Sequence, residues 1–127
     1  MKIALIDYGS GNIQSAYKAL ELVSNSKKKI SIISNSKDLL KVDKIILPGV
    51  GAFKNTIDKL NSKNIFEVIS EIKSKEIPLL GICLGMQLFF EESEEFGKSK
   101  GLSLMEGTVK KLPVLSLSHE KLKIPSI

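Results

Sequence analysis

A chain of 127 residues has the size of one domain, and we expect a single domain over residues 1–127. Its hydrophobic content of 43% and charged content of 26% are ordinary for a soluble globular protein, and no apolar run is long enough to span a bilayer. The start, MKIALIDYG, lacks the long apolar stretch of a signal peptide, and one cysteine, Cys83, cannot form an internal disulfide. We therefore expect a cytoplasmic protein without a membrane partner.

The formal net charge of +5 raises the question of a nucleic-acid or phosphate partner. All 19 basic residues are lysine, so the planar fork of arginine, which suits recognition of bases and phosphates, is absent. The lysines are scattered, and their one triplet, residues 27–29, lies where a loop leads into a strand. We expect a solvated loop there and no nucleic-acid partner; a polyanion site is the alternative.

The first part of the chain alternates strands with helices. Residues 2–8 (KIALIDY) predict a buried strand, residues 9–12 a turn, and the next segment a helix with Ser10 or Asn12 as its cap. The apolar residues of this helix recur at spacings of three and four: Ile13, Ala16, Tyr17, Leu20 and Val23. Residues 29–34 (KISIIS) predict a second strand, and SNSKDLL, which begins at residue 34, a short capped helix.

The same alternation continues to the middle of the chain. Residues 44–47 predict a third strand, and residues 53–75 predict two helices separated at residues 61–64. Residues 77–82 (IPLLGI) predict a fourth strand, followed by a helix that continues through Met86, Leu88 and Phe89. The order βαβαβαβα predicts an α/β fold with a doubly wound, mainly parallel sheet.

Three glycine-containing turns follow strands one, three and four: DYGSGN, PGVGAF and GICLGMQ. Each could serve only the turn itself, but ligands of such folds bind beyond the carboxyl ends of the strands, so three together indicate a site. None is a nucleotide motif, because GSGNIQ lacks the third glycine of the dinucleotide fingerprint and GVGAFK lacks the lysine and hydroxyl of a P-loop. One cysteine and one histidine, His119, cannot supply a metal site, and we expect no metal and no cofactor.

The turn around Cys83 has the pattern Gly-x-Cys-x-Gly at a strand-to-helix junction, which matches a nucleophile elbow with sulfur in place of the serine oxygen. The following helix would stabilise the thiolate, and the N–H of Leu84 would bind an oxyanion. A second donor could come from the amides of Gly49, Val50 or Gly51. The alternative is that Cys83 is simply a small buried hydrophobe, as free cysteines usually are.

Four segments occur in order between residues 2 and 113: IDYGSGNIQS, LPGVGAF, PLLGICLGMQLFFEES and GLSLMEGTVKKLP. Together they resemble the class I glutamine amidotransferases, and most closely the glutaminase that serves a cyclase in histidine biosynthesis. The resemblance implies a flavodoxin-like fold and release of ammonia from glutamine through a cysteine thioester. It also implies a heterodimer in which the ammonia passes to the cyclase subunit, a (β/α)₈ barrel.

The resemblance also implies roles for individual residues. Cys83 would be the nucleophile, and the amides of Gly51 and Leu84 would surround the oxyanion. Gln87 would hold the substrate glutamine; the alternative is a solvated helix residue. Asn12 would face the cyclase; the alternative is a helix cap.

The family completes its catalytic triad with a histidine and a glutamate on a late segment, to which nothing here corresponds. His119 and Glu120 lie upstream of LKIPSI, the stretch that resembles the start of that segment, and we expect them in a surface loop. The resemblance thus implies a C-terminally incomplete domain over residues 1–127 that is inactive by itself. The alternatives are a non-catalytic module that docks on the cyclase and a related cysteine hydrolase of the same architecture.

The segment beyond the fourth strand would then lack neighbours. We expect strands near residues 107–112 and 121–125 with unpaired edges, and an apolar surface that is partly uncovered. That surface would comprise Leu112, Val114, Leu115 and Leu117.

Overall fold

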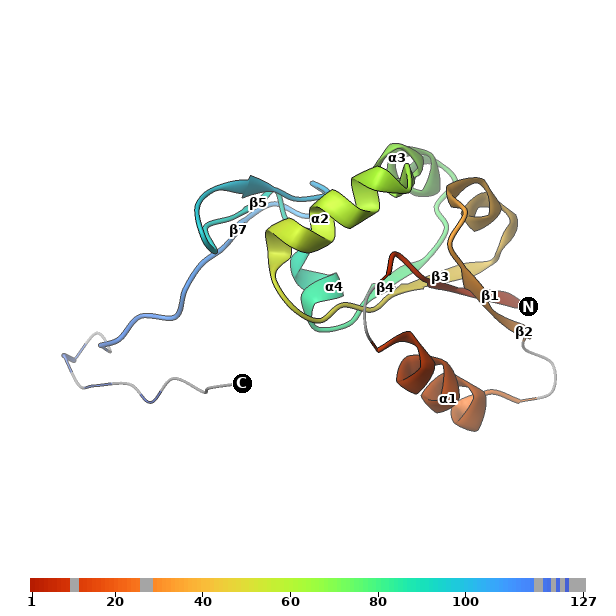
Figure 1. The fold of residues 1–127 in the computed structure, drawn as a ribbon, viewed down its shortest axis with the longest axis horizontal. Helices are drawn as coiled ribbons and strands as arrows, with labels where there is room; N and C mark the ends of the chain where they lie inside the picture. Colours follow the sequence, from red (N-terminus) through yellow and green to blue (C-terminus); the bar gives the residue numbers. More distant parts are fainter. Residues whose placement is uncertain (10–11, 26–28, 116–117, 120, 122, 124–127) are drawn as a thin grey trace.

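The computed structural model describes residues 1–9, 12–25, 29–115, 118–119, 121 and 123. Its centre is a parallel sheet of four strands in the order β2-β1-β3-β4 (Figure 1). The strands are β1 (Lys2–Ile6), β2 (Lys29–Ile33), β3 (Lys44–Leu47) and β4 (Leu79–Gly81). Each strand lies within the apolar run that predicted it, and the buried strand residues belong to the two central strands, β1 and β3.

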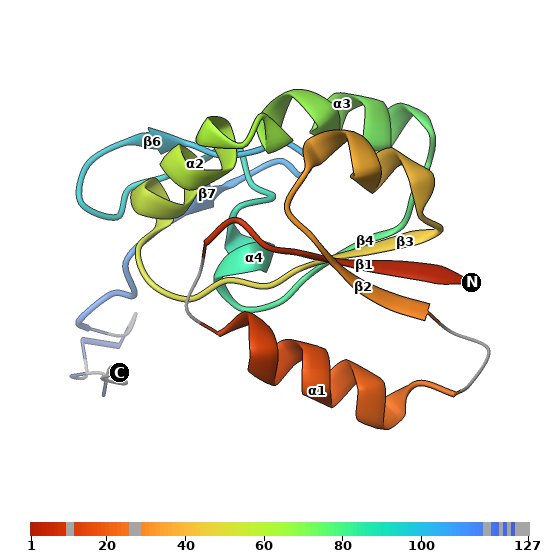
Figure 2. The same ribbon diagram turned by 45° about the vertical axis from the view of Figure 1, so that its right-hand side comes forward.

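Helices lie on both sides of this sheet, as the doubly wound fold predicts. Figure 2 shows α1 (Ile13–Val23) alone on one side and the 3₁₀ helix η1 (Ser36–Lys41) with α2 and α3 on the other. The predicted helical stretch over residues 53–75 is two helices, α2 (Phe53–Ser62) and α3 (Ile65–Ser74). Asn64, at a φ of 56°, makes the break between them. The predicted α/β fold is confirmed.

The main hydrophobic core lies between the sheet and the side that carries η1, α2 and α3. Alternate residues of the strands point to this side, and helix residues at spacings of three and four meet them. Its fully buried members include Ala4, Ile6, Leu39, Leu47, Phe53, Leu60 and Leu88. On the other side, α1 has no buried residue, and Val23, which we expected on its apolar face, is 78% exposed.

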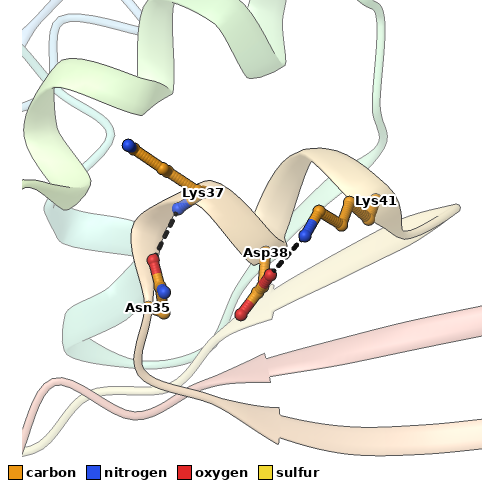
Figure 3. Close-up of polar contacts among 4 residues, drawn as sticks. All are labelled: Asn35, Lys37, Asp38 and Lys41. Atoms are coloured by element: carbon orange, nitrogen blue, oxygen red, sulfur yellow. Dashed lines mark hydrogen bonds and ion pairs between the residues drawn. The ribbon is translucent and has the colours of Figure 1, made fainter.

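The helix η1 shows how local chemistry produces a predicted element. The side chain of Asn35 accepts a hydrogen bond of 3.0 Å from the backbone N–H of Lys37 and so caps the first turn (Figure 3). One turn later, Lys41 Nζ lies 2.8 Å from Asp38 Oδ1 on the exposed surface (Figure 3). The capped helix that SNSKDLL predicts therefore forms, as a 3₁₀ rather than an α-helix.

Several element ends differ from the prediction. β1 ends at Ile6 rather than Tyr8, and β4 covers residues 79–81 rather than 77–82. The helix after Cys83 is wrong in length: α4 (Leu84–Gln87) has four residues and ends before Leu88. The carbonyls of Leu88 and Phe89 instead accept hydrogen bonds of 2.8 Å from the amides of Leu102 and Leu104, so the chain leaves the helical path to meet a later segment.

A second, small sheet was not predicted. It has the order β6-β5-β7 and consists of β5 (Glu92–Ser93), β6 (Ser99–Lys100) and β7 (Thr108–Val109). β7 lies within the strand expected near residues 107–112 but has only two residues. Strands of two residues are too short to show an alternating pattern, so this sheet leaves little signal in the sequence.

The chain after β7 runs away from the body of the molecule (Figure 1). Leu112, Val114 and Leu115 are at least half exposed, as expected; Leu117 lies outside the described residues. Lys121 forms an isolated antiparallel bridge with Leu115, and most of the strand expected over residues 121–125 also lies outside them. In the part of the chain that the structure describes, no helix has the length and apolar character needed to cross a bilayer.

Candidate active site

Cys83 lies in the turn between β4 and α4, at the carboxyl edge of the sheet. It occupies the N-cap position of α4 with φ 56° and ψ −118°, a left-handed conformation that is strained for a residue with a side chain. Its thiol is free and the residue is exposed. The prediction of an elbow that presents the sulfur to solvent agrees with this geometry, and the alternative of a buried cysteine does not.

The glycines around Cys83 allow close packing of two turns. A Cβ atom at Gly85 would overlap the carbonyl oxygen of Leu47, at the end of β3. A Cβ atom at Gly49 would lie 2.7 Å from the backbone N of Gly85. The PGVG turn and the Cys83 turn are therefore in direct contact, which only glycines permit at these two positions.

Backbone amides surround this junction. The N–H groups of Leu84, Val50 and Gly51 have no hydrogen-bond acceptor among the described residues. Gly51 has a φ of 98°, which favours glycine there. Sequence reasoning missed what holds the PGVG turn in place: the buried Tyr8 hydroxyl donates a 2.7 Å hydrogen bond to the Pro48 carbonyl. Tyr8 lies two residues after the end of β1, and this position was the only signal for its role in the sequence.

A cavity of about 300 Å³ opens beside Cys83. It brings together residues from all three predicted turns and from α1: Asn12, Ala16, Ala19, Pro48, Gly49, Val50, Ile82 and Cys83. Leu84 is buried and does not line it. The small side chains of Ala16 and Ala19, which sequence reasoning assigned no role at the site, leave this space between α1 and the ends of the strands.

Asn12 is the N-cap residue of α1, but its side chain makes no capping hydrogen bond. It is exposed and lines the cavity next to Cys83. The alternative role as a side-chain cap is thus not seen, and Ser10, the other predicted cap, lies outside the described residues.

Gln87 lies one turn after Cys83, and its backbone N–H donates a 3.3 Å hydrogen bond to the Cys83 carbonyl. Its side chain lines a different cavity of about 500 Å³, together with Glu94, Glu95, Phe96, Val109, Lys110 and Lys111. Glu95 links this cavity to α2, because its carboxylate accepts a 3.0 Å hydrogen bond from the N–H of Phe53. Sequence reasoning missed Glu95, for which the acidic run EESEE was the only signal.

His119 lies in the exposed segment after β7, with a φ of 64°, and does not line the cavity beside Cys83. This placement agrees with the expected surface loop. Across the described residues, no group of three or more His, Cys, Asp or Glu side chains is arranged to hold a metal ion. The site presents an exposed thiol next to backbone N–H groups that have no acceptor among the described residues.

Comparison with known proteins gives relatives for most of the chain. It is 46% identical over 112 residues to the imidazole glycerol phosphate synthase subunit HisH of Bacillus thuringiensis (strain Al Hakam) and of Bacillus cereus (strain 03BB102). The match covers 88% of this chain and 52% of each relative, so the chain spans about half the length of the curated relatives it matches.

Solved structures share the fold. A crystal structure of a glutamine amidotransferase superposes with a TM-score of 0.69 at 16% identity, over 84% of this chain and 55% of that one. A protein from Listeria monocytogenes EGD-e, described as a candidate peptidase E, superposes with a TM-score of 0.58 at 16% identity, over 72% of this chain and 50% of that one. At such identity these two likenesses concern the fold alone.

A family model for class I glutamine amidotransferases matches residues 4–123, which include β2, β3, β4, the last three residues of β1 and the Cys83 turn. Together with the 46% identity to curated relatives, this match settles the family. The chain belongs to the class I glutamine amidotransferases.

Proposed function

We propose that this chain provides the nucleophile of a glutaminase that supplies ammonia to imidazole glycerol phosphate synthase, in histidine biosynthesis. The observation that carries the proposal is the geometry of Cys83, an exposed thiol on a strained turn that packs against the PGVG turn. The family match supports glutamine as the substrate class, and the names of the relatives at 46% identity support imidazole glycerol phosphate synthase as the enzyme that is served.

The proposed reaction has two steps. The Cys83 thiolate attacks the side-chain amide carbon of glutamine. The amide nitrogen takes up a proton, the C–N bond breaks, and ammonia leaves. The γ-glutamyl thioester that remains is hydrolysed by water to glutamate, which frees the thiol. During each step an oxyanion forms, and the N–H groups of Leu84 and Gly51 or Val50 are the donors proposed to stabilise it. Gln87 is proposed to hold the substrate.

The proposed partner is a cyclase subunit with a (β/α)₈ barrel, joined in a cytoplasmic heterodimer. Asn12 is the residue proposed to face it, because Asn12 is exposed at the rim of the cavity that contains Cys83. Ammonia released at Cys83 would leave through this side of the molecule. No cofactor is required for the two steps.

The two steps also need a base that takes the thiol proton and returns it to the leaving ammonia. Residues 1–127 contain one histidine, His119, which does not line the Cys83 cavity. We therefore propose that residues 1–127 form a partial glutamine amidotransferase domain that is inactive alone. The same observation favours a second candidate function, a non-catalytic module that docks on the cyclase.

Glutamate release from glutamine by the purified chain tests the proposed inactivity. We expect the same background rate for the wild type, Cys83→Ala and His119→Ala. Turnover by the wild type that is lost in Cys83→Ala would show that a base is present, and its loss in His119→Ala would identify that base.

Covalent labelling tests the assignment of the nucleophile separately. A glutamine analogue with a diazoketone in place of the amide should modify Cys83, and added glutamine should slow the modification more than added asparagine. Mass spectrometry locates the label, and Cys83→Ala is the control. Labelling that glutamine does not slow would contradict a glutamine site and favour the non-catalytic module.

A further inference from the structure

The hydroxyl of Tyr8 lies directly against the turn that follows β3. The Tyr8 side chain is buried in the main core, and its hydroxyl donates a 2.7 Å hydrogen bond to the Pro48 carbonyl. A Cβ atom at Gly49 would lie 3.0 Å from the same hydroxyl oxygen. The backbone before Tyr8 is held in the sheet, because the Asp7 N–H donates a 2.9 Å hydrogen bond to the Ile33 carbonyl. The PGVG turn therefore packs on a side chain that is itself well fixed.

The PGVG turn is anchored at its two ends and makes no hydrogen bonds between them. At one end, the Tyr8 hydroxyl is the only donor to the Pro48 carbonyl among the described residues. At the other end, the Ala52 carbonyl accepts hydrogen bonds from both the N–H and the hydroxyl of Thr56, at 3.2 and 3.1 Å. Residues 49–51 make no hydrogen bond to another described residue. The orientation of their peptide units therefore depends on the two anchors.

The Tyr8 hydrogen bond orients the first peptide unit of the turn. The bond between Pro48 and Gly49 is trans, and in a planar trans peptide the C=O and the N–H point in opposite directions. When the Tyr8 hydroxyl holds the Pro48 carbonyl, the Gly49 N–H thus points away from Tyr8. Rotation of this unit would displace the next two N–H groups along the chain, which are the proposed oxyanion donors.

We propose that Tyr8 is a positioning residue of the candidate active site, because its hydroxyl fixes, through Pro48, the N–H groups of the PGVG turn that serve the oxyanion. Tyr8 does not line the Cys83 cavity, so it acts through the turn and not on the thiol. The inference rests on the proposed function in one respect, the role of the PGVG amides as oxyanion donors. It implies that loss of the hydroxyl slows those reactions of Cys83 that pass through an oxyanion and leaves the others unchanged.

Two reactions of Cys83 separate oxyanion stabilisation from exposure of the thiol. In acyl transfer from S-phenyl thioacetate, the sulfur bonds to the carbonyl carbon, an oxyanion forms, and its collapse breaks the bond to thiophenolate. In alkylation by iodoacetamide, the sulfur displaces iodide in one step without an oxyanion. Both reactions use the same thiolate, whose proton goes to the buffer, so the ratio of the two rate constants measures oxyanion stabilisation. Neither reaction requires the chain to hydrolyse glutamine.

Two variants remove one buried hydroxyl each from the two ends of the turn. Tyr8→Phe leaves the Pro48 carbonyl without a donor among the described residues. Thr56→Val is the matched control, because the Thr56 N–H still holds the Ala52 carbonyl. The two residues are similarly buried, with exposed fractions of 1% and 3%.

Mass spectrometry measures acetylation and alkylation of Cys83 in each variant, and Cys83→Ala gives the background. The ratio of acyl transfer to alkylation should be at least ~10-fold higher in the folded wild type than in the same chain in urea. Tyr8→Phe should lower the ratio ~10-fold with the alkylation rate unchanged, because a displaced donor no longer meets the oxyanion. Thr56→Val should keep the wild-type ratio.

Amide NMR spectra locate the change, since the resonances of residues 49–51 should shift more in Tyr8→Phe than in Thr56→Val. Equal ratios in the wild type and Tyr8→Phe would overturn the role of Tyr8 and leave the oxyanion donors in place. Equal losses in the two variants, or a parallel fall of both rate constants in Tyr8→Phe, would make the Tyr8 hydroxyl a structural group only and overturn the proposal as well. A wild-type ratio no higher in the folded chain than in urea would contradict the oxyanion donors of the proposed function, and the role of Tyr8 with them.

Discussion

Residues 1–90 and residues 91–115, called here the first and second segments, are packed very differently. Residues 1–90 contain every buried hydrophobic residue of the described chain except Leu102. The segment over residues 91–115 contains three strands of two residues each, and its large apolar residues Phe96, Met105 and Leu112 are more than half exposed. Since burial of apolar surface is the main source of stability, the first segment contributes most of the stability of the fold.

The candidate site includes residues of both segments. Cys83, the PGVG turn and the cavity that both line belong to the well-packed first segment. The cavity of Gln87 is lined mostly by residues of the second segment, including Glu95 and Lys110. The candidate nucleophile thus lies in a closely packed turn, whereas the cavity proposed to hold the substrate is formed by a segment with few buried residues. The packing that positions the Cys83 thiol therefore does not by itself form the cavity proposed to hold the substrate.

The largest expected effect concerns local stability. Amides in β1 and β3 should exchange with solvent about 10³-fold more slowly than those in β5, β6 and β7, because the first set opens only when the core unfolds. Hydrogen exchange followed by mass spectrometry or NMR measures the ratio. Uniform protection from β1 through Lys110 would show that the second segment is as stable as the first.

A smaller effect is expected from Gly85→Ala. The added Cβ would overlap the Leu47 carbonyl, and we expect the free energy of unfolding to fall by at least ~3 kcal/mol in urea titrations. Gly97→Ala is the matched control in the second segment. A Cβ at Gly97 meets nothing within 4 Å, so only the φ of 94° is unfavourable for alanine. That change should cost ~1 kcal/mol. Equal losses would contradict the close packing of the two turns.

The smallest expected effect distinguishes two asparagines at helix starts. Asn35→Ala removes the hydrogen bond to the Lys37 N–H and should lower the free energy of unfolding by about 0.5–1 kcal/mol. Asn12→Ala removes no capping hydrogen bond and should change it by less than ~0.3 kcal/mol. Thermal and urea unfolding of both variants provides the measurement. A larger loss for Asn12→Ala would mean that its side chain stabilises α1 after all.

The main sheet could be predicted from the sequence because each of its strands is a short apolar run followed by glycine or proline or by a helical pattern. KIIL, which directly precedes Pro48 and Gly49, is an example. The short α4 could not be predicted, because Leu88 and Phe89 continue the helical spacing. What ends the helix is a set of hydrogen bonds from residues 102–105, which are distant in sequence.

The site was only partly predictable for the same reason. The glycines on either side of Cys83 and in the PGVG turn carry a local signal, and the structure brings these turns into contact. The Tyr8 hydrogen bond to Pro48 and the Glu95 hydrogen bond to Phe53 join residues about 40 positions apart, and no local pattern announces them. The roles of Gly51, Leu84, Gln87 and Asn12 stay predictions.

We propose that the fold makes Cys83 an accessible nucleophile, and the alkylation rate of its thiol tests this most directly. The rate constant with iodoacetamide at pH 7 is measured by mass spectrometry for the folded chain and for the same chain in urea. We predict faster reaction in the folded chain, because the turn exposes the sulfur and the N–H of the next residue, Leu84, has no acceptor among the described residues and can stabilise a thiolate. A folded chain that reacts more slowly than the unfolded one would contradict the proposed accessibility of the Cys83 thiol.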